Sequence, residues 1–336
     1  MFPSPLIAAP MAGGVSTTEL VTEVARAGGL GFLAAGYKSA ADMQAEITAI
    51  RASNLPFGVN LFVPGPPASN RDALRAYRDS LGPLADHFGV TLPEPRYDAD
   101  AWDSKIETLL ADPVPFVSLT FGLPDRSVIR ALQDRGTVVI ATVTRLPELL
   151  IAQHHGVDAA IIQHSSAGGH SAVFDSGASA VETTVDVATL TADLIPHATV
   201  PLIAAGGLTG GSGIRNALAA GAVAAQVGTL FLRTPESGAR QPHKDALGSQ
   251  AFPRTAMTRA FSGRPARGLE NRFMREHRDA PLGYPELHYV TAPLRAAAAA
   301  AGDPEAMALW AGTGYRAAAP IGAAAVCGLL LAGLDR

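Results

Sequence analysis

The stretch of residues 161–170 carries the side chains best suited to chemistry. It runs from an apolar segment through Gln163 and two serines to the pair Gly168-Gly169 and then His170. Paired glycines let backbone approach a flat ligand and adopt dihedral angles closed to other residues. An imidazole directly after them exchanges protons near neutral pH. His170 is therefore our candidate catalytic residue, although a Gly-rich turn with a solvated histidine explains this stretch alone about as well.

Two further glycine turns follow apolar runs later in the chain. One ends in Gly206 and Gly207, and the other in Gln226, Val227, Gly228 and Thr229. If both runs are parallel strands of one barrel, their turns form the usual phosphate cradle from backbone N–H groups and a helix N-terminus. Thr229 adds a hydroxyl, and neither turn contains a lysine or arginine.

Amide and thioether side chains at other strand ends suggest what ligand the cradle holds. Asn60 and Gln163 each offer paired donors and acceptors, which suit the edge of a heteroaromatic ring. Met11 offers a soft apolar surface for the face of such a ring. Each residue alone has a simpler explanation, since a strand-end asparagine is commonly a cap and Met11 a core residue. Together with Gly168 and the cradle, they predict a flavin mononucleotide (FMN) site.

Short apolar strands and helices with apolar residues at helical spacing alternate along the chain and position these residues. Such alternation means right-handed crossovers and a parallel sheet, and eight strands predict a (β/α)8 barrel. A doubly wound sheet is the alternative, but no strand is followed by the glycine fingerprint of a dinucleotide fold. The expected strands are 6–11, 30–33, 56–62, 115–121, 137–142, 157–162, 200–205 and 224–229.

The alternation breaks twice, and the breaks suggest the domain boundaries. We expect an FMN-binding barrel over 1–235, with an insertion over 64–112 that has helices near 70–88 and 100–111. A mainly helical cover domain is expected over 236–315, with no strand after Thr229 and a helix from Ala296 to Trp310. A C-terminal helix from about Ala317 to Leu331, within 316–336, is expected to pack back on the barrel.

Composition excludes several classes of protein. Of 336 residues, 48% are hydrophobic and 17% charged, so disorder is not expected. The net charge of −4 argues against a nucleic-acid or anionic-membrane surface. The single cysteine, Cys327, excludes an internal disulfide and a cysteine-based metal site. No signal peptide and no uninterrupted membrane span are seen, so we expect a soluble cytoplasmic protein, as monomer or homodimer.

Metal and phosphosugar chemistry are poorly supported. His154 and His155 are adjacent on a helix and point about 100° apart, so they do not chelate together. No His-x-x-x-His pair or carboxylate cluster stands at the strand ends, and we expect no metal. A phosphosugar enzyme would share the cradle but needs a strand-end lysine or acid, and none is present.

Nearly the whole chain resembles the nitronate monooxygenases, formerly called 2-nitropropane dioxygenases, and is similar to their class I branch. The resemblance rests on Ala9-Pro10-Met11-Ala12-Gly13-Gly14, Pro56-Phe57-Gly58-Val59-Asn60-Leu61-Phe62, Ala167-Gly168-Gly169-His170, Ala204-Ala205-Gly206-Gly207 and Gln226-Val227-Gly228-Thr229. Ser262-Gly263-Arg264-Pro265-Ala266-Arg267-Gly268 and Leu309-Trp310-Ala311-Gly312-Thr313-Gly314 add support beyond the barrel.

The resemblance implies non-covalent FMN and the oxidation of alkyl nitronates such as propionate 3-nitronate by dioxygen, through an anionic flavin semiquinone, to a carbonyl product and nitrite. It implies that His170 is the active-site histidine, and that Asn60, Gln163, Gly168, Gly207 and the segment from Gln226 to Thr229 bind FMN. Its members mostly detoxify nitronates. The chain departs from the family around His170, where Ser166 and Ser171-Ala172 replace an acidic residue and Arg-Gly.

Several alternatives stay open from the residues. The nearest alternative is an FMN-dependent NAD(P)H reductase of quinones or enoyl thioesters, which would use the same scaffold. Two further alternatives are an FMN-dependent dehydrogenase of another barrel family and a flavin-binding carrier without turnover. For a neutral nitroalkane, His170 would be the base that removes the α-proton. Arg264 and Arg267 would meet a substrate carboxylate, unless they are surface arginines.

Overall fold

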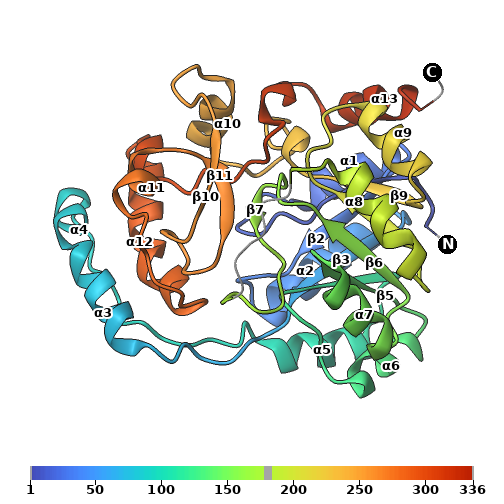
Figure 1. Ribbon diagram of the computed structural model, residues 1–336, viewed down its shortest axis with the longest axis horizontal. Helices are drawn as coiled ribbons and strands as arrows, with labels where there is room; N and C mark the ends of the chain where they lie inside the picture. The colour runs from blue at the N-terminus through green and yellow to red at the C-terminus, as the bar shows by residue number, and fades with distance from the viewer. Residues whose placement is uncertain (1, 178–183, 335–336) are drawn as a thin grey trace.

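A closed barrel of eight parallel strands is the centre of the computed structural model, which describes residues 2–177 and 184–334 (Figure 1). Its strand order is β1-β2-β3-β4-β5-β6-β8-β9, with β9 pairing back onto β1. The predicted (β/α)8 barrel is confirmed. The strands are β1 (Leu6–Ala8), β2 (Leu30–Ala34), β3 (Phe57–Phe62), β4 (Phe116–Thr120), β5 (Val138–Val143), β6 (Ala159–Gln163), β8 (Leu202–Ala205) and β9 (Ala224–Val227).

The strands read as unbroken apolar runs because both of their faces are buried. Side chains such as Ile7, Phe32 and Ile161 are at most 1% exposed and fill the barrel interior. Their neighbours in sequence point outward into a second layer beneath the helices, where Leu33 and Ile162 are fully buried. Polar strand residues such as Asn60 and Gln163 line a cavity at the carboxyl ends of the strands.

In the part of the chain that the structure describes, eight helices cover the barrel wall. Local signals set their ends: Thr17 caps α1 by accepting from the backbone N–H of Leu20, and Gly156 ends α7 at φ +84°. The helix α13 packs against α1 and α9 and completes the ring. The eight are α1 (Thr18–Arg26), α2 (Ala40–Arg51), α5 (Trp102–Ala111), α6 (Arg126–Gln133), α7 (Leu146–His155), α8 (Val187–Leu194), α9 (Gly211–Ala219) and α13 (Ala323–Ala332).

The segment between β3 and β4 leaves the ring and returns to it. The helices α3 (Arg71–Ser80) and α4 (Gly82–Phe88) extend away from the barrel and pack against α12 (Glu286–Ala300), whereas α5 lies between α2 and α6 (Figure 1). The helix expected over 70–88 is thus divided before Pro83, and the one expected over 100–111 is present. The irregular segment after His170 extends into residues 178–183, which lie outside the described residues.

Strands continue beyond Thr229, so the expectation of none there is wrong. A three-stranded sheet has the order β10-β11-β7, with β10 (Thr255–Thr258) and β11 (Ala266–Leu269) antiparallel and β7 (Gly169–His170) added to β11. These strands are short, and β7 is a strand only because it pairs with β11, which is distant in sequence. The sheet joins the segment after β6 to the cover (Figure 1).

The long helix of the cover is α12, Glu286–Ala300, rather than the expected Ala296–Trp310. The alanine run is its C-terminal end, and Pro293 lies inside it. The remaining cover helices are α10 (Gln241–Gly248) and α11 (Arg272–Glu276), and short 3₁₀ turns are η1 (Ile195–His197), η2 (Thr229–Phe231), η3 (Pro304–Ala306) and η4 (Tyr315–Ala317). No helix within the described residues is long and apolar enough to span a membrane.

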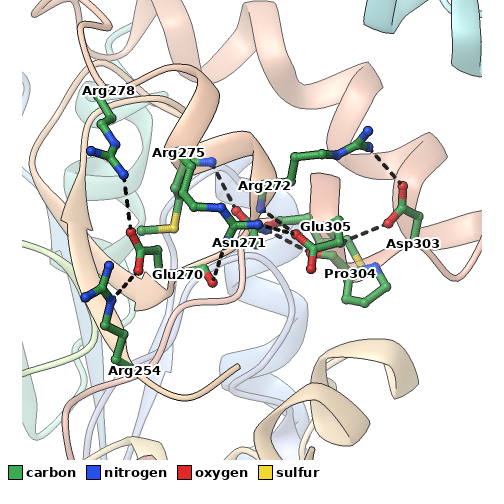
Figure 2. Close-up of polar contacts among 11 residues, drawn as sticks. Arg254, Glu270, Asn271, Arg272, Arg275, Arg278, Asp303, Pro304 and Glu305 are labelled. Atoms are coloured by element: carbon green, nitrogen blue, oxygen red, sulfur yellow. Dashed lines mark hydrogen bonds and ion pairs between the residues drawn. The ribbon is translucent and has the colours of Figure 1, made fainter. Parts of the chain in front are cut away.

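Asn271 organises the chain that follows α12. It is fully buried, and its side-chain nitrogen donates to the carbonyls of Pro304 and Met307 at 2.8 Å each (Figure 2). Around it, Arg272 and Arg275 lie 3.7 Å and 3.5 Å from the carboxylates of Asp303 and Glu305 (Figure 2). This network accounts for part of the arginine-rich segment and fixes the approach of the chain to Trp310.

Candidate active site

A cavity of about 390 Å³ opens at the carboxyl ends of the barrel strands, and residues of α10 and α12 and the segment around Trp310 also line it. His170 lines this cavity, and so does every residue predicted to bind a cofactor. These are Met11, Asn60, Gln163, Gly168, Gly206, Gly207, Gln226, Val227, Gly228 and Thr229. Side chains from β1, β3, β6, β8 and β9 therefore converge at one place, as the barrel topology requires.

Backbone donors without acceptors collect at the β8 and β9 ends of the cavity. The N–H groups of Gly207, Gly228 and Thr229 donate to no other described residue. Gly207 has φ +69°, and a Cβ there would lie 2.7 Å from the Ser166 Oγ, so only glycine fits. The helix α9 begins nearby, which adds the positive end of its dipole. Such a set of free N–H groups suits a phosphate.

Gly168 serves the packing of two loops. A Cβ on it would lie 2.5 Å from the backbone of Ala311 and Gly312, and the Thr313 N–H donates to the Ser166 carbonyl at 3.0 Å. The Gly312 N–H in turn donates to the Thr229 hydroxyl at 3.0 Å. The loop after β6, the β9 end and the chain after Trp310 are therefore joined at the cavity wall.

The side-chain amides of Asn60 and Gln163, at the ends of their strands, already form hydrogen bonds within the protein. The Asn60 side-chain nitrogen lies 2.9 Å from the hydroxyls of Ser118 and Thr120, so its hydrogens are used within the barrel. Gln163 clamps its own loop, because its nitrogen donates to the His170 carbonyl at 3.0 Å and its oxygen accepts from the Ala172 N–H at 2.7 Å. Gln163 thereby holds His170 in place.

Two buried acceptors at the cavity have no donor within the described part of the chain. They are the side-chain oxygen of Gln226 and the Nε2 nitrogen of His243. Burial lowers the pKa of His243 to about 4, so its imidazole is neutral. Because buried acceptors without partners are costly, both point to a ligand that carries N–H or O–H groups.

His170 projects from β7 into a box of aromatic rings. Its ring centroid lies 5.4 Å from that of Trp310, 5.5 Å from Tyr284 and 5.9 Å from Phe121. Its Nε2 is 2.8 Å from the Ser262 hydroxyl. Burial lowers the pKa of His170 to about 3, and the positive charges of Arg264 and Arg295 add to the effect. The imidazole is therefore neutral at physiological pH.

A chain of polar rings continues the wall away from His170. The Tyr284 hydroxyl is 3.0 Å from the Tyr37 hydroxyl, and Tyr37 stacks on His288 with ring centroids 3.7 Å apart. Burial raises the pKa of both tyrosines, so their hydroxyls stay protonated. Asp100 accepts from the Tyr37 backbone N–H and pairs with Lys105 at 2.8 Å, which ties Tyr37 to the segment before α5.

Arg264 and Arg267 are buried, at 5% and 7% exposed, and neither lines the cavity. The Arg264 guanidinium donates to the Ser171 carbonyl at 3.1 Å and lies 3.9 Å from the Phe121 ring centre. Arg267 donates to the Ser165 carbonyl at 2.7 Å. The surface alternative is wrong, since both arginines are buried and brace the loop that carries His170, whereas the substrate contact stays a prediction.

Several cavity residues were missed from the sequence. Tyr37 follows β2, so its place just beyond a strand end was the available signal. Trp310 lies in a segment that supported the family resemblance, but no role followed from it. His243, His288 and Arg295 come from α10 and α12, where no sequence pattern indicates that the helices face a cavity.

Comparisons with known proteins agree with this geometry. A model of the family described as nitronate monooxygenase matches residues 1–331. The chain is 38% identical to the nitronate monooxygenase of Pseudomonas aeruginosa, covering 95% of this chain and 93% of that protein. It is 35% identical to a probable nitronate monooxygenase of Staphylococcus saprophyticus, over 93% and 89%.

Two solved structures share the fold of this chain. Nitroalkane oxidase from Streptomyces ansochromogenes superposes with a TM-score of 0.94 at 45% identity, covering 99% of this chain and 96% of that chain. FabK from Thermotoga maritima superposes with a TM-score of 0.75 at 25% identity, covering 99% and 93%.

Proposed function

The chain belongs to the nitronate monooxygenase family, and from this premise we propose that it binds FMN non-covalently and oxidises alkyl nitronates with dioxygen, giving a carbonyl product and nitrite. Propionate 3-nitronate is our candidate substrate. One observation supports this most: the free N–H groups of Gly207, Gly228 and Thr229 line the same cavity as the neutral imidazole of His170.

The residues present fit FMN. Its phosphate would meet the three free N–H groups, where glycine is required at Gly207 for close approach. The unpartnered acceptors of Gln226 and His243 would meet the ring N–H and the ribityl hydroxyls. Met11 offers an apolar contact for the ring face. Neither glycine turn contains an aspartate or glutamate that would repel the phosphate.

When bound, FMN would supply the electron transfers that link nitronate oxidation to dioxygen. The protein's part is to hold the substrate beside His170 and to exclude water from the aromatic box of Phe121, Tyr284 and Trp310. The neutral His170 offers an N–H or a lone pair without bringing a formal charge. A nitronate is already a carbanion, so its oxidation needs no strong base.

Neutral nitroalkanes would need a base, and we assign that role to His170. Its Nε2 is engaged with Ser262, whereas its Nδ1 makes no bond to any described residue. With the Nε2 proton donated to the Ser262 hydroxyl, the Nδ1 lone pair would accept the α-proton. The likeness to a protein named nitroalkane oxidase supports this assignment.

Oxygen consumption and nitrite release by the FMN-loaded protein test the proposal. We expect both with propionate 3-nitronate in the absence of any nicotinamide. The rival NAD(P)H reductase would instead oxidise NADH or NADPH with a quinone or an enoyl thioester and release no nitrite from the nitronate. That second result would overturn the proposed function.

A further inference from the structure

An ion pair behind the cavity holds the loop that follows β2. The Lys105 ammonium, on α5, lies 2.8 Å from the Asp100 carboxylate, and the two side chains are 1% and 14% exposed. Neither residue lines the cavity. Burying two charges costs desolvation energy that their attraction often fails to recover, so an apolar pair of similar volume would serve stability as well. The ion pair therefore indicates a role in positioning.

The pair binds both sides of one tight turn. The Lys105 Nζ donates to the Ala35 carbonyl at 2.8 Å, and the Asp100 carboxylate accepts from the Tyr37 N–H at 2.8 Å. Tyr37 has φ +66°, in the left-handed region that a tyrosine rarely adopts. Such a conformation persists only where the surrounding structure imposes it, and the ion pair supplies that restraint.

Left-handed backbone collects at this part of the cavity wall. Five non-glycine residues in the described part of the chain have positive φ, and four of them belong to the wall beside His170 or to its support. These four are Tyr37, Asp100, Ala101 and Phe121. Strained backbone of this kind clusters at functional sites, where it fixes a side chain that the site requires.

The side chain that the turn fixes lies at the cavity. Tyr37 stacks on His288 with ring centroids 3.7 Å apart and meets the Phe62 ring edge-on at 5.4 Å. All three residues line the cavity together with His170. The Tyr37 hydroxyl lies 3.0 Å from that of Tyr284, whose ring centroid is 5.5 Å from that of His170. The turn therefore brings a hydroxyl to the wall beside His170.

The two tyrosine hydroxyls share one hydrogen bond but carry two hydrogens. One hydrogen thus has no acceptor among the described residues. Because Tyr37 lines the cavity and Tyr284 does not, we assign the unused hydrogen to Tyr37. Burial raises the pKa of Tyr37, so its hydroxyl is protonated at neutral pH. The nitro oxygens of a nitronate carry negative charge and accept such a hydrogen bond.

We propose that the Tyr37 hydroxyl donates a hydrogen bond to a nitro oxygen of the bound nitronate, and that Lys105 and Asp100 are positioning residues that hold Tyr37 for this contact. The inference rests on the proposed function, because it takes the nitronate to lie beside His170. Lys105 and Asp100 act only through Tyr37, since neither reaches the cavity.

Ethyl nitronate tests the contact, because its nitro group is its only hydrogen-bond acceptor. Tyr37→Phe keeps the ring and removes the hydroxyl. Loss of one hydrogen bond to a charged group should raise KM for ethyl nitronate roughly 10- to 100-fold. The kcat should stay within about twofold, because the bond forms when the nitronate binds.

Two double variants test the ion pair without leaving a buried charge unpaired. Asp100→Ala with Lys105→Met removes the acceptor of the Tyr37 N–H and should raise KM for ethyl nitronate at least about fivefold. Asp100→Asn with Lys105→Met returns a side-chain oxygen to that N–H and should recover most of the loss. Rescue by the asparagine variant distinguishes positioning of Tyr37 from the loss of two charges.

A coupling measurement separates positioning from a general structural role. If the ion pair acts through Tyr37, adding Asp100→Ala and Lys105→Met to Tyr37→Phe should raise KM by less than about twofold more. If the pair only supported the fold, the two losses would multiply.

Lys38→Met with Glu46→Gln is the matched control. It removes a partly buried ion pair of 2.6 Å from the residue next to Tyr37, and neither residue lines the cavity. KM for ethyl nitronate should stay within about twofold. The Kd for FMN, measured by fluorescence titration, should stay close to the wild-type value in every variant. The melting temperature reports whether each variant is folded.

An unchanged KM in Tyr37→Phe would overturn the nitro contact, and losses that multiply in the combined variant would overturn the positioning role. Loss of FMN from Tyr37→Phe would show that the hydroxyl holds the flavin instead. Failure of the proposed function looks different: the wild-type protein would oxidise no nitronate, and the nitro contact would be overturned with it. Hydrogen exchange of the Tyr37 N–H, expected to be fast only in Asp100→Ala with Lys105→Met, would still report whether the pair holds this turn.

Discussion

The protonation state of His170 decides what chemistry the residue performs. With its pKa lowered to about 3 by burial, His170 is neutral over the whole physiological range. It therefore does not offset the nitronate charge as an imidazolium. A neutral imidazole serves instead as hydrogen-bond partner and, for nitroalkanes, as proton acceptor.

Replacing His170 with asparagine should separate the two substrate forms. His170→Asn removes the base, so turnover of a neutral nitroalkane should fall at least about 100-fold, whereas turnover of its preformed nitronate should fall less than about tenfold. Steady-state rates on the two forms of one compound measure this. Ser262→Ala, which retains the imidazole, is the matched control with a smaller loss on the nitroalkane. Equal losses on both forms for His170→Asn would refute its role as base.

The buried histidines also predict how stability depends on pH. His243 has a folded pKa of about 4, below the unfolded value of about 6.5, so the unfolded chain binds more protons between these values. Stability is therefore complete above about pH 6.5 and falls as the pH drops towards 4, by up to about 1.4 kcal/mol per pH unit for one histidine.

His243→Asn should flatten this dependence in the apoprotein. Asparagine keeps a donor for the Trp310 carbonyl, which His243 bonds in the folded state, but it does not titrate. Urea unfolding at about pH 7 and about pH 5 gives the free energy of unfolding of both proteins. An identical loss of stability in the variant and the wild type would show that His243 is not the group responsible.

At the scale of elements, the carboxyl ends of the barrel strands were the most predictable part of the site. Once eight parallel strands were expected, Asn60, Gln163 and Gly207 had to face one mouth, and they do. The clamp made by Gln163 could not be foreseen, because its partners lie in an irregular loop. Nor could β7, whose two residues form a strand only because β11 lies beside them.

The cradle gives a prediction at this scale. Gly207→Ala places a side chain at φ +69° and 2.7 Å from the Ser166 hydroxyl, which strains the turn and displaces its N–H group. The Kd for FMN should rise at least about tenfold, by the loss of about one charge-assisted hydrogen bond. Fluorescence titration of the apoprotein with FMN measures it.

Gly210→Ala is the control for that titration. Gly210 lies in the same loop with an extended backbone and has no atom within 4 Å of an added Cβ. Its FMN affinity should stay close to that of the wild type. If Gly207→Ala bound FMN as tightly as Gly210→Ala, the phosphate would lie elsewhere.

At the scale of the whole molecule, the cover completes the site instead of only closing it. Ser262 and Trp310 contact His170, and Arg264 braces the loop that carries it. The sequence indicated a cover but neither its strands nor the position of α12, because alanine-rich composition marks a helix without fixing its ends. The contacts of Ser262, Trp310 and Arg264 with His170 and its loop could therefore not be predicted from the sequence.

Replacing Asn271 tests whether its hydrogen bonds position the segment that leads to Trp310. Asn271→Ala leaves the carbonyls of Pro304 and Met307 without their donor, at roughly 1–3 kcal/mol for each buried group. We expect a lower melting temperature and faster hydrogen exchange over residues 304–310. Asn70→Ala removes only the exposed cap of α3 and is the control. Normal exchange near Trp310 in Asn271→Ala would show that this network does not position the segment.

The most direct test of the central claim is the visible spectrum of the FMN-loaded protein, mixed without oxygen with propionate 3-nitronate and, separately, with NADH and NADPH. We predict a rapid change to the spectrum of one-electron-reduced flavin with the nitronate alone, and nitrite once air is admitted. Full bleaching by a nicotinamide, with no response to the nitronate, would contradict the account and assign the protein to the reductases.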